Sequence, residues 1–332
     1  MRWWAHWGVQ YLLAKVPGGG VVHRMMQEKA GQLRHIERGH QFDNALLILD
    51  MASQHAGSLA GLRVAEIGTG WIPAVPVALA LTGCEVHTYD VLALTKPDFL
   101  RRTLQTWEPR LAEIAEATKQ PLLDIYDRWD RLSRSETLNA LCEMTGGEYL
   151  APVDTTSLPY ESGTYDLVLS NLAMPSIPDG LIVPVLQESV RLLKPSGWSI
   201  HRIRMTDEYA ATDPDRHHLH YLTYPTATWK RWFDHRHKCQ NRWRASHFLN
   251  AFRDVGLLQR EVRRHQDSSG AAYFQKVPLA PEFQACDEED LNTIGIDVVL
   301  QKPSAPGVWQ NSMRVLPTQN LMPALSVPDE TR

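Results

Sequence analysis

The spacing of hydrophobic positions along the chain changes near residue 60. Before that point, apolar residues recur at helical intervals and predict three helices: Trp3–Val16, Val21 to about Ile36, and Phe42 to about His55. From residue 62 to residue 205, short apolar runs of strand length alternate with helical segments. The final segment, 304–332, contains many prolines and little periodicity, which predicts a disordered tail.

Five short apolar runs bounded by turn-forming residues predict strands. They are Leu62–Ile67, Glu85–Tyr89, Tyr149–Val153, Tyr165–Ser170 and Trp198–Met205. The segments 73–81, about 97–145 and 181–193 predict helices between them, and the runs 258–265 and 294–301 predict two further strands. Strands that alternate with helices in this way predict a doubly wound α/β fold with a mostly parallel, seven-stranded sheet.

The predicted layout of the chain has three parts. Residues 1–60 form an N-terminal helical cap, residues 61–303 form the α/β domain, and residues 304–332 form the tail. Helical insertions at about 97–145 and 206–245 interrupt the α/β domain, and the second is rich in His, Arg, Trp and Tyr. Residues 206–245 are called the insertion below.

Composition narrows the classes of protein to which this chain can belong. It has 332 residues and a formal net charge of −4, so it lacks the basic surplus of a nucleic-acid-binding protein, and no nucleic acid partner is expected. No apolar run approaches the roughly 18 residues that span a bilayer. Four widely spaced cysteines without a C-x-x-C pair argue against a structural zinc site or a disulfide framework and favour a reducing cytoplasm. These cysteines are Cys84, Cys142, Cys239 and Cys286.

Three tryptophans, Trp3, Trp4 and Trp7, lie in the first predicted helix. One interpretation is peripheral contact with the inner face of a membrane, since Trp side chains favour the bilayer interface. The other is that the Trp-rich face packs on the domain or on a second subunit, and this interpretation is favoured because apolar helix faces are usually buried by protein.

The first predicted strand ends in a glycine turn, Gly68-Thr69-Gly70, that leads into a helix. Glycines let a ligand approach the backbone closely, and the end of a strand places that ligand in the crevice of an open sheet. A dinucleotide fingerprint would need a third glycine where this chain has Pro73. Pro73 and Pro76 also each remove an N–H group that a pyrophosphate would use. The turn therefore favours a cofactor without phosphates, such as S-adenosylmethionine.

Three acidic residues fall at consecutive predicted strands. Glu66 lies just before the glycine turn, Asp90 follows the second strand, and Asp154 follows the third. A carboxylate at the second position can bind both hydroxyls of a ribose, and the third lies where an adenine amino group would be. The alternative is that all three are strand-end or helix-capping residues.

Several motifs occur in a fixed order along the chain. They are V-A-E-I-G-T-G-W at 64–71, Y-D at 89–90, A-P-V-D at 151–154, Y-D-L-V-L-S-N at 165–171 and R-L-L-K-P-S-G at 191–197. Over about residues 60–205 they resemble the motifs of class I S-adenosylmethionine-dependent methyltransferases. The G-T-G-W-x-P turn resembles a bacterial subgroup, and that likeness extends to the Trp-rich helix and to Q-N-R-W-R at 240–244. The resemblance implies a Rossmann-like sheet whose last strand is antiparallel.

The resemblance also implies which residues would hold S-adenosylmethionine. Gly68 and Gly70 would pass close to its methionine part, and Asp90 would hold the ribose. Asp154 with Thr155 would border the adenine. The full predicted set is Glu66, Gly68, Thr69, Gly70, Asp90, Val91, Asp154, Thr155, Ser170 and Asn171.

The chain departs from the family pattern at two places. The third glycine of the first motif is replaced by Ile72, and Pro175 and Ser176 occupy the positions of an E-H pair that many relatives carry after the fourth strand. The departure at the E-H pair motivates an alternative, in which the fold and the cofactor site are kept but catalysis is lost. A nicotinamide-dependent oxidoreductase of similar fold is a second alternative.

A methyltransferase must align its acceptor and, for an O or N acceptor, remove a proton. His201 on the fifth strand and Asp207 just after it are the predicted catalytic residues, and the alternative for His201 is a histidine of the sheet core. The predicted substrate residues lie in the insertion. They are Tyr209, His220, Asn241 and Arg242.

The insertion carries five histidines as well as interleaved basic and aromatic side chains. The histidines raise the alternative of a metal site, but the nearby carboxylates Asp213, Asp215 and Asp234 show no diagnostic spacing, so no metal is predicted. The basic and aromatic residues suit an anionic acceptor, with RNA as a weaker alternative. The predicted function is methyl transfer to an O or N atom of a small-molecule or glycan acceptor.

Overall fold

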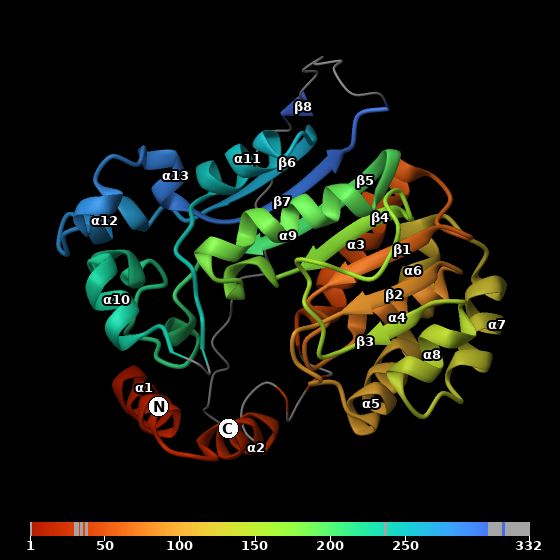
Figure 1. The fold of residues 1–332 in the computed structure, drawn as a ribbon, viewed down its shortest axis with the longest axis horizontal. Helices are drawn as coiled ribbons and strands as arrows, with labels where there is room; N and C mark the ends of the chain where they lie inside the picture. Colours follow the sequence, from red (N-terminus) through yellow and green to blue (C-terminus); the bar gives the residue numbers. More distant parts are fainter. Residues whose placement is uncertain are drawn as a thin grey trace.

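The computed structural model describes residues 2–29, 33, 36, 39–235, 238–304 and 314–315. Its centre is an eight-stranded sheet in the order β3-β2-β1-β4-β5-β7-β6-β8 (Figure 1). The strands are β1 (Arg63–Ile67), β2 (Glu85–Tyr89), β3 (Glu148–Leu150), β4 (Tyr165–Asn171), β5 (Leu193–Arg204), β6 (Leu258–Gln266), β7 (Thr293–Gln301) and β8 (Arg314–Val315).

The strand directions confirm the predicted fold class. β1 pairs in parallel with β2 and β4, β2 pairs in parallel with β3, and β4 pairs in parallel with β5. β7 lies antiparallel between β5 and β6, as expected for the last strand of the seven-stranded sheet. The two-residue β8 pairs in parallel with β6 and, together with Ser304, is the described part of the predicted tail.

The helices of the described chain lie on both faces of the sheet and beyond its edge. They are α1 (Trp3–Lys15), α2 (Gly19–Lys29), α3 (Gln41–Ala56), α4 (Ala74–Leu81), α5 (Pro97–Trp107), α6 (Leu111–Thr118), α7 (Leu122–Leu132), α8 (Leu138–Met144), α9 (Asp179–Leu192), α10 (Thr226–Trp232), α11 (Ala245–Asp254), α12 (Gly270–Phe274) and α13 (Glu288–Asn292). Short turns of 3-10 helix connect several of them.

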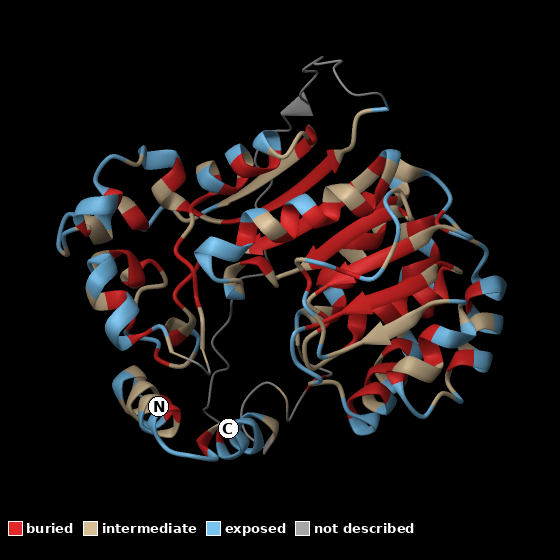
Figure 2. Ribbon diagram, in the orientation of Figure 1, coloured by how far each residue is buried: buried red, intermediate tan, exposed pale blue. Residues whose placement is uncertain are grey.

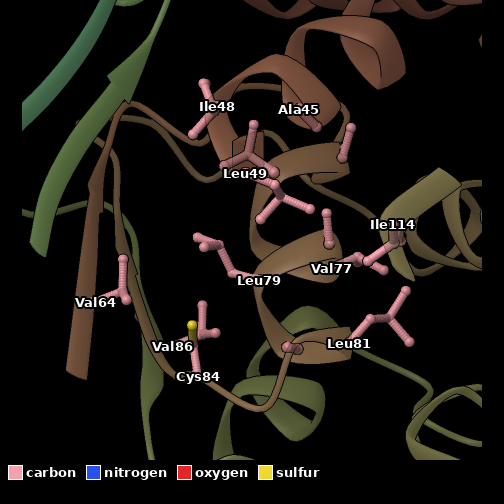
Figure 3. Packing of buried hydrophobic residues seen from close by; sticks show 14 of the residues in the cluster. Ala45, Ile48, Leu49, Val64, Val77, Leu79, Leu81, Cys84, Val86 and Ile114 are labelled. Atoms are coloured by element: carbon pink, nitrogen blue, oxygen red, sulfur yellow. The ribbon is translucent and has the colours of Figure 1, made fainter. Parts of the chain in front are cut away.

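Alternate side chains of the buried strands enter two separate hydrophobic clusters, one on each face of the sheet. Val64 of β1 packs with α3 to α8 (Figure 3), whereas the next residue, Ala65, packs with α9 and α11 on the other face. Every residue of α4 is buried, because this helix lies between the sheet and other helices. Figure 2 shows the result, a buried sheet whose covering helices expose only their outer sides.

A third hydrophobic cluster belongs to the insertion and to α1. Tyr209, Tyr221, Trp229 and Phe233 form its buried centre, and Trp3 and Trp7 pack against it. Residues 1–60 therefore do not lie together as one cap: α1 packs on the insertion, whereas α3 packs in the cluster of α4. In Figure 1 α1 lies close to α10, away from α3.

Two of the three tryptophans of α1, Trp3 and Trp7, thus pack on the insertion, as the favoured interpretation of this helix predicts. The indole N–H of Trp7 donates to the carbonyl of Trp232 over 2.7 Å, and the backbone N–H of Trp3 donates to Asp213 over 2.9 Å. Trp4 points outward and is 60% exposed. Among the described residues, no helix combines the length and apolar character needed to cross a bilayer.

Most predicted elements occur where the sequence places them, with differences at their ends. β3 ends at Leu150, not at Val153, since Pro152 has no N–H group to donate to a neighbouring strand. β5 begins at Leu193, five residues before its predicted start at Trp198, through a register shift against β4. Most of the predicted second helix beyond Lys29, up to about Ile36, lies outside the described residues. So do residues 305–313 and 316–332 of the predicted tail.

Candidate functional site

The carboxyl ends of β1, β2 and β3 are joined by backbone hydrogen bonds. The N–H of Gly68 donates to the carbonyl of Tyr89 over 2.7 Å, and the N–H of Asp90 donates to the carbonyl of Leu150 over 3.1 Å. The N–H of Val153 donates to the carbonyl of Asp90 over 2.9 Å. The three predicted acidic positions therefore belong to one edge of the sheet, where open α/β folds bind ligands.

The two glycines of the turn are required for different reasons. Both have positive φ, +85° at Gly68 and +69° at Gly70. A Cβ atom on Gly68 would lie 2.4 Å from the Cβ of Ala173, so this glycine allows the loop after β4 to pack closely. A Cβ atom on Gly70 would meet nothing within 4 Å, so Gly70 borders open space. The loop after β4 is itself unusual, since Leu172 has a φ of +59°.

Asp90 connects the end of β2 to the glycine turn. One carboxylate oxygen accepts the N–H of Gly70 over 2.8 Å, and the other accepts the N–H of Leu92 over 2.9 Å. Burial raises the pKa of Asp90, while these backbone hydrogen bonds act in the opposite direction. A carboxylate offers about four acceptor positions, more than the backbone N–H groups of Gly70, Leu92 and Val91 occupy, so it can still accept from a ligand.

Glu66 is a fully enclosed acid directly below the turn. Burial raises its pKa to about 8, and the nearby charge of Asp90 adds to this effect. The hydroxyl of Thr88 donates to its carboxyl group over 2.8 Å, and the same hydroxyl pairs with that of Thr69. No cationic side chain of the described residues forms an ion pair with Glu66 or Asp90. The turn is thus bordered by two buried acids without a positive partner in the part of the chain that the structure describes.

The helix after the turn begins with few free N–H groups. Pro73 is the N-cap of α4, and Pro76 lies in its first turn. Neither residue has a backbone N–H, so the start of α4 is poorly suited to bind a phosphate.

The predicted adenine side of the site is more open than the turn. Asp154 is exposed, and one of its oxygens accepts both the N–H of Thr156 over 2.9 Å and its hydroxyl over 2.7 Å. These two hydrogen bonds hold the pKa of Asp154 below its ordinary value. Thr155 is buried and Val91 is 58% exposed. Asp154 therefore closes its own turn and still faces solvent.

Ser170 and Asn171 at the end of β4 have different surroundings. The Ser170 hydroxyl hydrogen bonds with Nδ1 of His201 over 2.8 Å and is completely buried. The side-chain oxygen of Asn171 is also buried but has no hydrogen-bond partner among the described residues. Such an atom is costly to leave unpaired, so a donor from a bound molecule would stabilise it.

His201 has the environment of a histidine of the sheet core, which was the alternative interpretation. Its Nε2 hydrogen bonds with the Ser199 hydroxyl over 2.8 Å, and its ring stacks on Phe252 at a centroid distance of 5.1 Å. Burial lowers its pKa to about 3, so the ring is neutral near pH 7. Because both ring nitrogens already have partners, this geometry does not favour His201 as a general base.

Asp207 lies in a buried ion pair within the insertion. Its carboxylate accepts from Nε of Arg216 over 2.8 Å and from the N–H of Tyr209 over 2.9 Å. Burial raises the pKa of Asp207, and the charge of Arg216 opposes that shift. The Arg216 guanidinium also lies 4.2 Å from the ring centroid of Trp3. This carboxylate organises the insertion and, like His201, is not placed as a free base.

Two predicted substrate residues hold the insertion in place. The Asn241 side chain donates to the carbonyls of Met174 and Ile177 over 2.7 and 2.9 Å, which ties the insertion to the loop after β4. Arg242 is buried and pairs with Glu282 at 3.0 Å. The structure therefore gives both residues positioning contacts.

Tyr209 and His220 complete the predicted substrate set. The Tyr209 hydroxyl is buried and donates to Gln10 over 3.0 Å, so it joins the insertion to α1. His220 hydrogen bonds with the hydroxyls of Tyr273 and Tyr224, and burial lowers its pKa to about 4. His220 lines a cavity of about 270 Å³ together with Trp3, Arg216 and Tyr273, among others. Of the predicted substrate residues, His220 is the one at this cavity.

The sequence interpretation missed two residues that act by positioning a predicted site residue. Ala173 sets the close approach to Gly68, and Arg216 neutralises Asp207. Neither residue stands in a motif, so pattern reading had no signal for them.

No model of a protein family matches this chain, and no curated protein matches it either. Solved structures do resemble it. A SAM-dependent methyltransferase from Methanosarcina mazei is 11% identical, with 73% of this chain and 93% of that chain covered and a TM-score of 0.42. A putative methyltransferase from Bacillus halodurans is 15% identical, with 77% and 98% covered and a TM-score of 0.42.

A third similar structure is the 1,6-didemethyltoxoflavin-N1-methyltransferase of Burkholderia thailandensis. It is 11% identical, with 87% of this chain and 91% of that chain covered and a TM-score of 0.42. The similar structures thus include S-adenosylmethionine-dependent methyltransferases and also a protein named as a [4+2]-cyclase. At these identities and TM-scores the likeness carries no argument about the function of this chain, which must rest on its own residues.

Proposed function

We propose that this protein is an S-adenosylmethionine-dependent methyltransferase that acts on an O or N atom of a small-molecule or glycan acceptor. The observation that carries the proposal is the pair of buried acids at the glycine turn, Glu66 and Asp90, which form no ion pair with a cationic side chain of the described chain. S-adenosylmethionine brings a sulfonium and an ammonium group, and a cation beside such acids favours their ionised forms. The sequence likeness to the bacterial subgroup with the G-T-G-W-x-P turn supports the same proposal.

The start of α4 argues against a nicotinamide dinucleotide. Its pyrophosphate would lie at this helix terminus, where Pro73 and Pro76 offer no N–H groups. Asp90 does not separate the two cofactors, because an acid after the second strand can bind a ribose hydroxyl of either. The oxidoreductase alternative therefore lacks a suitable set of backbone donors for the phosphates at the start of α4.

In this proposal the residues of the turn bind and orient the cofactor. Gly70, which borders open space, would pass the methionine part, and the free acceptor positions of Asp90 would take the ribose hydroxyls. The buried oxygen of Asn171 would accept a hydrogen bond near the methyl-donor end. When bound, S-adenosylmethionine supplies an electrophilic methyl group, so the protein has to align the acceptor and exclude water.

The acceptor would lie on the side of the site formed by the insertion. An anionic acceptor receives less support than the sequence suggested, because Arg216, Lys238 and Arg242 each pair with a carboxylate. The departure at Pro175 and Ser176 keeps the non-catalytic alternative as the main competitor.

The proposal is tested by labelled methyl transfer. Purified protein is mixed with a cell extract and methyl-labelled S-adenosylmethionine, and products are followed by mass shift, with Asp90→Ala as the matched negative control. We expect label in a low-mass product with the wild type only. Asp90→Ala should weaken cofactor binding by about 1–3 kcal/mol, since a charge-assisted hydrogen bond is lost.

Calorimetry of cofactor binding, combined with the labelling experiment, distinguishes the proposal from its alternatives. Cofactor binding by calorimetry without transfer to any acceptor would favour the non-catalytic protein. Equal affinity in wild type and a folded Asp90→Ala variant would contradict the placement of the ribose at β2.

A further inference from the structure

Three potential metal ligands lie together outside the cofactor site. The Nε2 atoms of His217 and His218 both face one oxygen of Asp267, with a distance of 3.7 Å from His217 and direct contact from His218. One ligand atom from each residue lies within 4.8 Å of the other two. The side chains are 17%, 33% and 15% exposed, so an ion from solvent could reach them.

The protein holds these side chains in place through other contacts. Asp267 directly follows β6, and its N–H donates to the carbonyl of Asn292 over 2.8 Å. The carbonyl of His218 accepts the N–H of Asp207 over 2.6 Å. The ring of His217 stacks on Tyr273 at a centroid distance of 4.1 Å and an angle of 8°. A site arranged in advance loses less entropy when an ion binds.

Metal binding would change the hydrogen bonds of His217. Its Nδ1 accepts the N–H of Leu219 over 3.1 Å, and its Nε2 lies 2.9 Å from the Ser269 hydroxyl. For Nε2 to bind a metal, the ring proton must move to Nδ1, so the ion would replace both of these hydrogen bonds. Two imidazoles and one carboxylate form a known ligand set for zinc that leaves a coordination position open.

We propose that His217, His218 and Asp267 bind one zinc ion. His217 also lines the cavity of about 270 Å³, so an open coordination position of the metal could be filled by water or by a ligand in that cavity. The ion would join the insertion to the end of β6, two segments that are about fifty residues apart in the sequence. This proposal does not depend on the proposed methyl transfer.

The test is zinc binding to the full chain after removal of metals with EDTA. Equilibrium dialysis should give one zinc per chain for the wild type. Asp267→Asn and His217→Gln should weaken binding at least about tenfold, because even indirect partners of a metal contribute 10- to 100-fold. His40→Gln is the matched control, since His40 is exposed, lies outside the group, and makes no side-chain hydrogen bond as the N-cap of α3.

A second readout protects the test against variants that fail to fold. Cobalt substituted into the wild type should give visible absorption bands typical of nitrogen and oxygen ligation, and zinc should remove them. Absence of zinc binding to the wild type, or binding that all variants retain, would overturn the proposal. So would wild-type cobalt spectra without such bands.

Discussion

The cofactor edge of the sheet and the insertion are built in opposite ways. At the cofactor edge, the turn and the strand ends are joined by backbone hydrogen bonds such as Gly68 to Tyr89. In the insertion, side-chain hydrogen bonds join the segments. The completely buried Arg244 donates to the carbonyl of Asp290 and to the hydroxyl of Tyr221. The cofactor edge therefore depends on chain geometry, and the insertion depends on particular side chains.

The largest expected effect is on the insertion. Arg216→Ala leaves the carboxylate of Asp207 buried without its partner and should lower the free energy of unfolding by about 3–5 kcal/mol. Arg134→Ala is the matched control, because the exposed Arg134–Asp130 pair should contribute only about 0–1 kcal/mol. Urea unfolding measures both, and equal losses would mean that the buried pair does not stabilise the insertion.

The two glycines of the turn provide the next comparison. Gly68→Ala should lower the free energy of unfolding by about 2–4 kcal/mol, because it combines a positive φ with the 2.4 Å approach to Ala173. Gly70→Ala should cost about 1–2 kcal/mol through φ alone. It should nevertheless reduce cofactor affinity strongly, since its methyl group enters the open space at the turn. A Gly70→Ala variant with wild-type affinity would place the cofactor elsewhere.

Glu66 gives the cofactor edge a pH dependence. Its pKa is about 8 in the folded protein against an ordinary value of 4.5, so the folded state binds more protons between these values. The stability of the wild type should therefore fall as pH rises from about 4.5 to 8 and then level off.

Glu66→Gln should remove this fall. The free energy of unfolding of the variant minus that of the wild type should therefore rise by on the order of a few kcal/mol between pH 5 and pH 8. Cofactor affinity of the wild type should rise over the same interval, because a bound cation favours the ionised acid. Parallel stability curves for the two proteins, measured by urea unfolding across this range, would show that Glu66 ionises normally.

The smallest expected effect concerns the outer surface of α1 and α2. Leu12 is 66% exposed and Met25 is 50% exposed, whereas Trp7 packs on the insertion. Lys15 and Arg24 add positive charge to these two helices, so peripheral contact of this surface with an anionic bilayer stays a prediction. We expect Leu12→Asp to reduce co-sedimentation with anionic vesicles without a loss of stability. Wild-type protein that stays in the supernatant would contradict peripheral membrane contact.

The cofactor half of the molecule could be predicted from sequence because its signals are local. The glycine turn and Asp90 each directly follow a predicted strand, and the doubly wound topology, in the sheet order β3-β2-β1-β4, brings these strand ends together. The role of His201 could not be predicted, since a strand histidine points to either face. Only the tertiary structure shows that its partners are Ser170, Ser199 and Phe252.

The insertion was beyond sequence analysis for a related reason. The carboxylates near its histidines in the sequence are Asp213, Asp215 and Asp234, whereas the one that contacts His218 is Asp267, which follows β6. Similarly, the basic residues suggested an anion site, but Arg216 pairs with Asp207 of the same insertion and Arg242 pairs with Glu282 from a later segment. Side-chain pairs between distant segments leave no spacing pattern in one sequence.

The most direct test of the central claim is calorimetric titration of the wild-type protein at pH 8 with S-adenosylmethionine and, separately, with NAD and NADP. We predict one S-adenosylmethionine site per chain, weakened in Gly70→Ala and Asp90→Ala, and no binding of either dinucleotide. Binding of a dinucleotide, with no heat from S-adenosylmethionine, would contradict the assignment of the glycine turn.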